Sequence, residues 1–402
     1  MKIQEASAIF YRHLTNRAFY YNIDVRKNES RVEMLKENVT LPAYPVTADM
    51  WDLLSRESRP IVVYGMGNGA DKLIKRFEKY GIEIADFFAS DGFVRGHSFH
   101  GKRVKSFSEI RSEYSDFVIV LSFASNREEV LSMLLDIDAH YDMFIPDMPV
   151  AGDEYFDREF YNFHYAEIVE AYNALSDEES KNIFAATVNY KLSGRMKYLL
   201  LARSTRDEIY SLLPCENIHT IIDAGAYNGD TAREAKNYFH NLKKIYAIEP
   251  DNKNFKKLAR YCEAEMEIQI VPINSAAWCE NTDGSFMNSG NRNSSVSSTA
   301  SFEHKDTGIS LVRLDSITNE KIDYIKYDVE GAEREALVGS DAIIRAYSPA
   351  MLVSLYHRSA DVFEIVNTLK ESYPEYDMYL RRLWCVPAWE LDLILVRKDK
   401  ND

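Results

Sequence analysis

The sequence has few cysteines and no paired metal-binding motif. Its four cysteines, Cys215, Cys262, Cys279 and Cys385, lie far apart, and none forms a C-x-x-C pair. Such spacing favours reduced thiols in the protein core and argues against a disulfide framework or a zinc site.

Long apolar runs and an excess of basic residues are also missing. No stretch approaches the roughly 18 apolar residues that a membrane span requires. Residues 1–5 show no basic-then-apolar export pattern, so we expect a cytoplasmic location. The 63 acidic residues outnumber the 48 basic ones, and the resulting formal charge of −15 would repel a phosphate backbone. We therefore expect neither a membrane span nor a nucleic-acid partner.

The length predicts more than one domain. At about one domain per 150 residues, the 402 residues correspond to two or three domains. The residue patterns divide the chain into a helical arm over residues 1–55, a smaller Rossmann-like α/β domain over 56–150, a helical connector over 151–215 and a larger α/β domain over 216–402. The arm resembles a packing or dimerisation element, so the sequence is compatible with a homo-oligomer.

The most informative stretch, residues 220–251, reads T-I-I-D-A-G-A-Y-N-G-D-T at its start and I-Y-A-I-E-P-D at its end. An apolar run, a turn bracketed by glycines, a helical segment and a second apolar run follow one another. This order predicts a strand–turn–helix–strand unit of a parallel sheet. Asp223 and Glu249 end the two strands. Because ligands bind beyond the carboxyl ends of parallel strands, both acids are expected to face one crevice.

The residues of this crevice favour one class of cofactor. Gly225 and Gly229 let the backbone approach a ligand, and an acid at the second strand end suits a ribose diol. A nicotinamide dinucleotide needs the pattern G-x-G-x-x-G, but Tyr227 and Asp230 occupy the second and third glycine positions. S-adenosylmethionine, which has a ribose but no phosphate, fits better. A purely structural turn is the alternative.

A second glycine turn follows the apolar run after Pro60. Gly65, Gly67 and Ala70 match G-x-G-x-x-A, and an acid ends the next apolar run. The candidate nucleotide or nucleotide-sugar site here consists of Gly65, Gly67, Asn68, Gly69 and Asp91. Since the domain has about half the length of a full dinucleotide fold, nicotinamide chemistry, nucleotide binding and a structural role all stay open.

Two further strand ends supply candidate residues for the same crevice. Asp328 ends the run Y-I-K-Y-D, and Glu330 and Glu333 begin the helix after it. We expect these acids to line the crevice; ordinary helix N-terminal acids are the alternative. His357 follows the apolar run at 350–356 and is expected to point into the same crevice as Asp328.

The segment between these strands is predicted to be less ordered. An apolar run ending near Val271 leads to Ser275 and Ala276, which are expected to pass beside the adenine of a bound cofactor. Residues 283–301 are rich in Gly, Ser and Asn. Such composition indicates a mobile loop, which near a crevice can fold over the substrate.

Residues 216–400 resemble a class I S-adenosylmethionine-dependent methyltransferase of the FkbM family. The resemblance lies in I-I-D-A-G-A-Y-N-G-D-T, I-E-P-D, L-D-S-I and Y-I-K-Y-D-V-E-G-A-E, of which the last is the most specific. It implies a seven-stranded sheet with the last strand antiparallel, and O-methylation of hydroxyls on sugars and other secondary metabolites. The first 150 residues resemble the nucleotide-binding domain of sugar-modifying enzymes.

The resemblance also implies roles for individual residues. The expected cofactor-binding residues are Asp223, Gly225, Ala226, Tyr227, Asn228, Gly229, Thr231, Glu249, Pro250, Asp251, Ser275 and Ala276. Asp328, Glu330 and His357 would face the acceptor. The sequence departs from many relatives at Tyr356, where these often carry an acid before the histidine.

The predicted reaction needs a base, because the sulfonium already activates the methyl group. A positioned base contributes roughly 10²- to 10⁴-fold. His357 is the first choice for that base, with Asp328 orienting or replacing it. A divalent metal is not expected; Asp328, Glu330 and His357 would hold one and lower the pKa of the hydroxyl.

We therefore expect an S-adenosylmethionine-dependent O-methyltransferase that acts on a hydroxyl of a sugar, glycan precursor or related metabolite, with or without a nucleotide attached. Two other classes stay open. One is an NAD(P)-dependent nucleotide-sugar oxidoreductase that uses the N-terminal domain. The other is a non-catalytic protein that binds S-adenosylmethionine.

Overall fold

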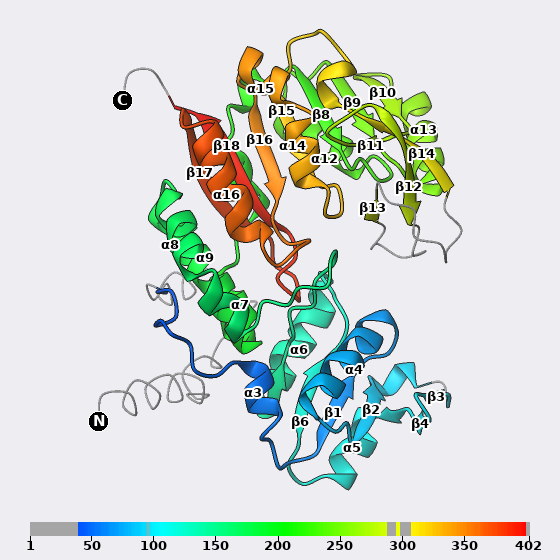
Figure 1. The fold of residues 1–402 in the computed structure, drawn as a ribbon. Coiled ribbons are helices and arrows are strands. Elements are labelled where there is room, and N and C mark those ends of the chain that lie inside the picture. Colours follow the sequence, from blue (N-terminus) through cyan, green and yellow to red (C-terminus); the bar gives the residue numbers. More distant parts are fainter. Residues whose placement is uncertain (1–38, 95, 288–294, 298–306, 399–402) are drawn as a thin grey trace.

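The computed structural model describes residues 39–94, 96–287, 295–297 and 307–398. In this part the chain forms two α/β domains joined by a group of helices (Figure 1). Most of the arm predicted over residues 1–55 lies outside the described residues; its described end contains the short helix α3 (Met50–Leu54).

The N-terminal domain is built on a five-stranded parallel sheet with the order β5-β2-β1-β6-β7. β1 and β6 are fully buried because both are short apolar runs with helices on either face. The strands are β1 (Ile61–Tyr64), β2 (Asp86–Ala89), β5 (Lys105–Ser106), β6 (Val118–Leu121) and β7 (Asp142–Phe144). The other elements are α4 (Asn68–Tyr80), α5 (Phe107–Glu113), α6 (Glu128–His140) and the hairpin β3 (Ser98–Phe99) and β4 (Lys102–Arg103). This confirms the smaller Rossmann-like unit.

The C-terminal domain contains a seven-stranded sheet with the order β10-β9-β8-β15-β16-β18-β17. β18 pairs antiparallel with both β16 and β17, and the other pairs are parallel, as predicted. The strands are β8 (Thr220–Ala224), β9 (Lys244–Ile248), β10 (Gln269–Ile273), β15 (Tyr324–Tyr327), β16 (Ala350–Ser354), β17 (Tyr376–Arg382) and β18 (Leu391–Arg397). The helices are α12 (Asp230–Tyr238), α13 (Asn252–Ala264), α14 (Glu333–Val338), α15 (Asp341–Tyr347) and α16 (Asp361–Ser372).

The connecting helices pack on the C-terminal sheet. α8 lies against α16, and α9 lies against β17, where Arg381 forms a 2.7 Å ion pair with Asp177. The helices are α7 (Arg158–Phe163), α8 (Tyr165–Ala174), α9 (Glu178–Ser193), α10 (Met196–Leu201) and α11 (Arg206–Ser211). None of the helices in the described part of the chain combines the length and apolar character needed to cross a membrane.

The loop predicted over residues 283–301 contains strands in its described part. β12 (Thr282–Met287) pairs antiparallel with β13 (Ser295–Ser297) and with β14 (Thr307–Val312), and β11 (Ala276–Ala277) completes this small sheet. The loop prediction was therefore wrong for these residues. Pairing with β14 outweighs the weak strand preference of Gly, Ser and Asn, because strand formation depends strongly on context.

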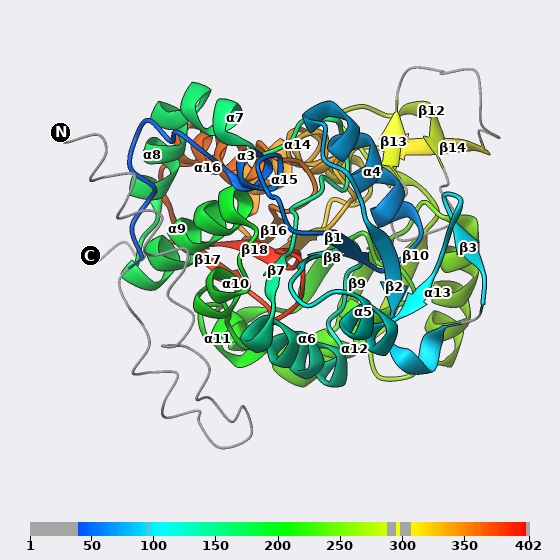
Figure 2. The ribbon, with the colours of Figure 1, turned by 90° about the horizontal axis from the view of Figure 1, so that it is seen from below.

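Backbone hydrogen bonds join the two domains next to the strand ends of the C-terminal sheet. Ser125, which follows β6, exchanges two hydrogen bonds of 2.8 and 2.9 Å with Val386. The N–H groups of Val150 and Ala151 donate to the carbonyl of His357 at 3.0 and 2.9 Å. The N-terminal domain thus lies across these strand ends, as Figure 2 shows from below.

One buried ion pair links α9 to the N-terminal domain. The Lys191 ammonium pairs with Asp147, and their side chains are 2% and 8% exposed. Replacing Lys191 by Met should lower the free energy of unfolding by about 3–5 kcal/mol, because it leaves a buried carboxylate unpaired. Lys181→Met, on the same helix but paired with the 83% exposed Glu178, should cost at most about 1 kcal/mol. Equal losses in urea denaturation of the two variants would contradict this account.

Candidate active site

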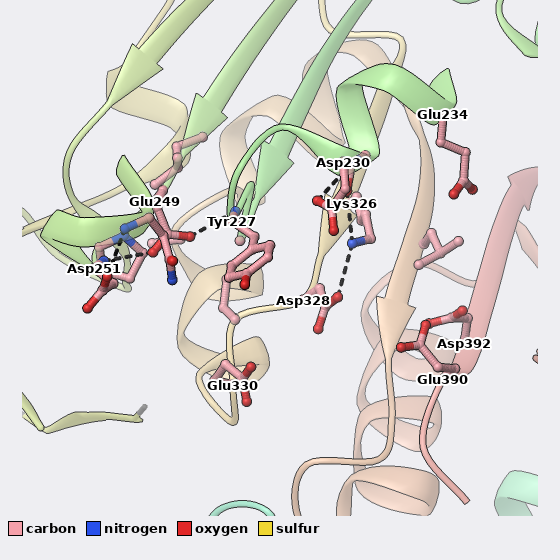
Figure 3. Close-up of a pocket in the computed structure, with 18 of the residues that line it drawn as sticks. Tyr227, Asp230, Glu234, Glu249, Asp251, Lys326, Asp328, Glu330, Glu390 and Asp392 are labelled. Carbon is pink, nitrogen blue, oxygen red and sulfur yellow. Dashed lines mark hydrogen bonds and ion pairs between the residues drawn. The ribbon is translucent and has the colours of Figure 1, made fainter. Parts of the chain in front are cut away.

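A cavity of about 670 Å³ lies at the carboxyl ends of β8, β9 and β15 (Figure 3). Its volume is typical of small-molecule sites. Asn126 from the N-terminal domain and Arg206 from the connector reach its wall, so three parts of the chain contribute to it. The location agrees with the crevice expected from the ends of the parallel strands.

The turn after β8 requires a glycine. Gly225 has a φ of +96°, and a Cβ atom there would lie 1.8 Å from the carbonyl oxygen of Asp328. The ends of β8 and β15 therefore pack backbone against backbone. Any side chain at this position would separate the two strands that carry Asp223 and Asp328.

Three residues with unfavourable backbone angles line the cavity. Tyr227, Glu330 and Glu390 have φ values of 46°, 56° and 56°, although none is a glycine. Such conformations cost about 1–3 kcal/mol each and persist where the surrounding structure fixes them. Their convergence on one cavity makes it the candidate functional site.

The carboxylate of Glu249 is held rigidly at the end of β9. Its Oε2 accepts the backbone N–H of Tyr227 at 2.8 Å, and its Oε1 accepts that of Asp251 at 2.7 Å. Burial raises the pKa of Glu249 to about 8, although these two hydrogen bonds oppose the shift. Each oxygen keeps a lone pair for a further donor, so the group can accept both hydroxyls of a diol in the cavity.

Asp223, at the end of β8, is buried beside Lys326 and Thr231. Its side chain is 0% exposed, and neither carboxylate oxygen has a partner of hydrogen-bonding geometry among the described residues. Burial raises the pKa of Asp223 to about 7, while the nearby Lys326 lowers it. The side chain of Thr231 also lowers this pKa, so Lys326 and Thr231 together stabilise the ionised carboxylate.

Lys326 and Asp328 form an ion pair in the wall of the cavity. The Lys326 ammonium donates to Asp328 at 3.0 Å and to the hydroxyl of Thr231 at 3.3 Å. Burial would raise the pKa of Asp328, but Lys326 and His357 together hold it below its usual value. Asp328 therefore stays ionised at neutral pH, and it also accepts the hydroxyl of Tyr356 at 3.1 Å.

Two acids that the sequence analysis missed lie across the cavity from Asp328 (Figure 3). Glu390 precedes β18 and Asp392 is its second residue. Asp392 is 6% exposed and accepts the hydroxyl of Ser354 at 3.2 Å. Burial, with the charges of Glu390 and Asp328, raises the pKa of Asp392 to about 8.

His357 is buried beneath the cavity wall and is absent from its lining. The ring is 0% exposed, with Nδ1 2.9 Å from Glu333 and Nε2 3.5 and 3.6 Å from Glu330 and Asp328. Burial would lower the pKa of His357, but these three carboxylates raise it to about 10. The imidazole is therefore protonated at neutral pH and has no free lone pair with which to accept a proton.

The other predicted residues fall into two groups. The predicted cofactor residues that line the cavity are Gly225, Tyr227, Thr231, Glu249, Pro250, Asp251 and Ala276. Those outside the lining are Asp223, Ala226, Asn228, Gly229 and Ser275. The polar lining residues that the sequence analysis did not select are Asn126, Arg206, Tyr210, Asp230, Glu234, Lys253, Asn254, Lys257, Tyr324, Lys326, Tyr356, Glu390 and Asp392.

The three residues named as possible metal ligands lie close together, with Nε2 of His357 3.6 Å from Asp328 and 3.5 Å from Glu330. Within the described ranges, no group of three or more His, Cys, Asp or Glu side chains is arranged to hold a metal ion.

The glycine turn of the N-terminal domain differs from a dinucleotide site. A Cβ on Gly65 would lie 2.7 Å from the ring of Phe123, and one on Gly69 would lie 2.1 Å from a carbonyl of the β6–α6 turn. These glycines therefore allow two turns of the protein to pack together. Asp91 is exposed, and its carboxylate accepts the N–H of Ser108 at 3.0 Å. The predicted residues Gly65, Gly67, Asn68, Gly69 and Asp91 thus do not form one pocket; Asn68 and Gly69 line a separate cavity.

The protonated state of His357 predicts a pH dependence of stability. Because its pKa is higher in the folded protein than the usual 6.5, its stabilising contribution is complete below pH 6.5 and is lost as the pH rises toward 10. The stability difference between the wild type and His357→Gln should therefore shrink from pH 6.5 to 9.5 in urea denaturation. A constant or widening difference would show that the ring is neutral.

Comparisons with known proteins agree with this geometry. Residues 223–383 match the family model described as the methyltransferase FkbM domain. A solved methyltransferase FkbM from Methylobacillus flagellatus KT is 18% identical, with a TM-score of 0.62 over 88% of this chain and 94% of that one. The two chains therefore share a fold across both domains. No curated protein matches the sequence.

Two other solved structures align with about half of the chain. An rRNA methylase from Streptococcus thermophilus is 12% identical over 48% of this chain and 93% of its own, with a TM-score of 0.32. Fibrillarin from Aeropyrum pernix, solved with S-adenosyl-L-methionine, is 17% identical over 47% of this chain and 73% of its own, with a TM-score of 0.30. Residues 223–383 of the C-terminal domain thus match the methyltransferase FkbM domain, and the seven-stranded sheet with a cavity at its strand ends agrees with that match.

Proposed function

We propose that the protein transfers a methyl group from S-adenosylmethionine to a hydroxyl oxygen of a sugar, glycan precursor or related metabolite. The observation that carries this proposal is the pair of buried carboxylates at adjacent strand ends. Glu249 is oriented by two backbone N–H groups, and Asp223 is buried beside Lys326 and Thr231. A ribose diol and an ammonium group are donors that such a pair can accept.

The charges of the cavity fit this cofactor. Its lining carries eight acidic side chains against four basic ones, Arg206, Lys253, Lys257 and Lys326, so the cavity favours a cation over a pyrophosphate. Glu249 would hold the ribose and Ala276 the adenine side. The Gly225 turn would hold the methionine end, and the buried Asp223 behind that turn would attract its positive charge. Bound S-adenosylmethionine supplies a methyl group that its sulfonium makes electrophilic.

Among the acids near the acceptor side, Asp392 is the best base. It lines the cavity, and its pKa of about 8 is matched to proton transfer near neutral pH. Asp328 is held ionised by Lys326, and His357 keeps its own proton. We therefore assign proton removal from the acceptor hydroxyl to Asp392, in place of the sequence-based choice of His357. Asp328 and Tyr356 would orient the acceptor.

The acceptor half of the cavity supports a polyhydroxylated substrate. Four carboxylates from three parts of the C-terminal domain line it, and each can accept hydrogen bonds from hydroxyl groups: Asp230, Glu234, Glu330 and Glu390. The same charges disfavour a phosphate inside this cavity. A nicotinamide oxidoreductase is less favoured, because the ring of Phe123 packs where Gly65 would meet a dinucleotide. A non-catalytic protein that binds S-adenosylmethionine is distinguished by the turnover measurement below.

Replacing Asp392 by Asn should lower kcat by about 10²- to 10⁴-fold, because the variant cannot take the hydroxyl proton. Turnover is followed as isotope-labelled methyl transfer into a panel of sugars, nucleotide-sugars and glycans. With S-adenosylmethionine at saturation, kcat/KM for the acceptor should rise from pH 6.5 toward 8.5 in the wild type as Asp392 loses its proton, and the variant should lose this rise. Asp377→Asn, on the neighbouring β17, is the control and should behave as wild type. An unchanged profile in Asp392→Asn would exclude it as the base.

The role of Glu249 predicts a change in cofactor affinity. Glu249→Gln removes the charge and one of the two acceptor oxygens, and hydrogen bonds to charged groups contribute about 1.5–3 kcal/mol. Calorimetry should therefore show binding of S-adenosylhomocysteine weakened about 10- to 100-fold. Glu263→Gln, on the exposed side of α13, should bind as the wild type does. Wild-type affinity in Glu249→Gln would remove the carboxylate from the cofactor site.

A further inference from the structure

A second cavity of about 390 Å³ lies at the end of the N-terminal sheet. Asn68 and Gly69, which follow β1, form one side of it, and Ser122 and Phe123, which follow β6, form another. The strand order reverses between β1 and β6, because the chain adds β2 on one side of β1 and β6 on the other. In open parallel sheets this reversal is where ligands bind. We call this space the switch-point cavity.

The walls of the switch-point cavity are flat and apolar. Phe123, Pro146 and Pro149 line it from the N-terminal domain, and Pro387 and Trp389 close it from the C-terminal domain. No carboxylate is among these described lining residues, in contrast to the acid-lined cavity above. Rings and prolines of this kind suit a planar ring such as a nucleobase.

One polar group in this wall lacks a partner. The indole Nε1 of Trp389 is buried, and no acceptor among the described residues reaches it. Leaving a buried donor unsatisfied costs about 1–3 kcal/mol. A ligand with a ring or sugar oxygen against Trp389 would satisfy it.

The start of α4 provides a place for an anion. This helix of 13 residues begins at Asn68, and its N-cap residue Gly67 makes no side-chain hydrogen bond. Gly67 has a φ of +111°, and the space beside it is open. The first N–H groups of the helix carry partial positive charge and favour a phosphate. Asp71 is the acidic residue in the first turn of this helix. Its carboxylate lies 2.7 Å from Nε2 of His100 and forms a hydrogen bond with that ring.

A basic side chain reinforces this end of the cavity. Lys72, one turn into α4, is the charged residue of the lining, and its ammonium donates to the carbonyl of Pro149 at 2.8 Å. Burial lowers the pKa of Lys72 below its usual value. An anion beside the ammonium group would offset that cost.

We propose that the switch-point cavity binds a nucleoside diphosphate, with the base between the flat walls and the phosphates at the start of α4 near Lys72. This site differs from the one predicted from the sequence, because Asp91 lies outside it. It also adjoins the methyl-transfer cavity: Trp389 lines the switch-point cavity, and the next residue, Glu390, lines the other. The inference does not depend on the reaction proposed above.

The test is a calorimetric titration of the full-length protein with UDP, GDP, ADP and inorganic pyrophosphate, with S-adenosylhomocysteine at saturation. At least one nucleoside diphosphate should bind with 1:1 stoichiometry, more tightly than pyrophosphate, and quench tryptophan fluorescence. Lys72→Met and Asn68→Asp should each weaken this binding at least tenfold. Asn68→Asp places an acid at a helix start, where it favours folding while repelling phosphate.

Three controls separate the outcomes. Lys75→Met, on the exposed side of α4, should bind the nucleotide as the wild type does. Trp389→Phe should remove most of the fluorescence change. Both Lys72→Met and Asn68→Asp should bind S-adenosylhomocysteine normally.

Several results would overturn the proposal. These are no nucleoside diphosphate binding, displacement of the nucleotide by S-adenosylhomocysteine, pyrophosphate binding as tightly as the nucleotides, or equal losses in Lys72→Met and Lys75→Met. Failure to bind S-adenosylhomocysteine while the nucleotide still binds would count against the proposed methyl transfer alone.

Discussion

The ammonium group of Lys326 balances the buried carboxylates on which the active-site cavity depends. It pairs with Asp328 at 3.0 Å and also lowers the pKa of Asp223. Because of its charge, the acids of the active-site cavity differ in their ionisation state. Asp328 is ionised at neutral pH, whereas burial raises the pKa values of Glu249 and Asp392 to about 8. Different environments for neighbouring carboxylates are how a site divides the roles of orienting a substrate and moving a proton.

The N-terminal domain is part of this arrangement. Its backbone N–H groups at Val150 and Ala151 donate to the carbonyl of His357, whose ring lies against Asp328, Glu330 and Glu333. His357 therefore connects the backbone contact between the domains to the carboxylates near the cavity. The hydrogen-bonded pair Ser125 and Val386 lies beside the same region. Residues next to this pair in the chain line the active-site cavity and the switch-point cavity. A ligand in either cavity would thus contact the segment that separates them.

The sequence predicted the strand ends well, because parallel strands bring their carboxyl ends to one edge. Asp223, Glu249 and Asp328 were found by that rule. Asp392 was missed because β18 is antiparallel, so its amino end reaches the same edge. His357 does follow a strand that ends at the cavity, but its ring turns beneath the wall toward Glu333. The positions of strand ends can be read from sequence patterns, whereas side-chain direction after a strand end depends on the tertiary contacts.

The central claim is that buried carboxylates at the ends of β8 and β9 bind the ribose and the cationic part of S-adenosylmethionine. Calorimetric titration with this compound at pH 7, repeated in buffers of different ionisation enthalpy, tests it most directly. We predict 1:1 binding with a net release of protons, because Glu249 and Asp223, with pKa values of about 8 and 7, must ionise to accept the ligand's hydroxyls and positive charge. Absence of binding, or binding without proton release, would contradict it.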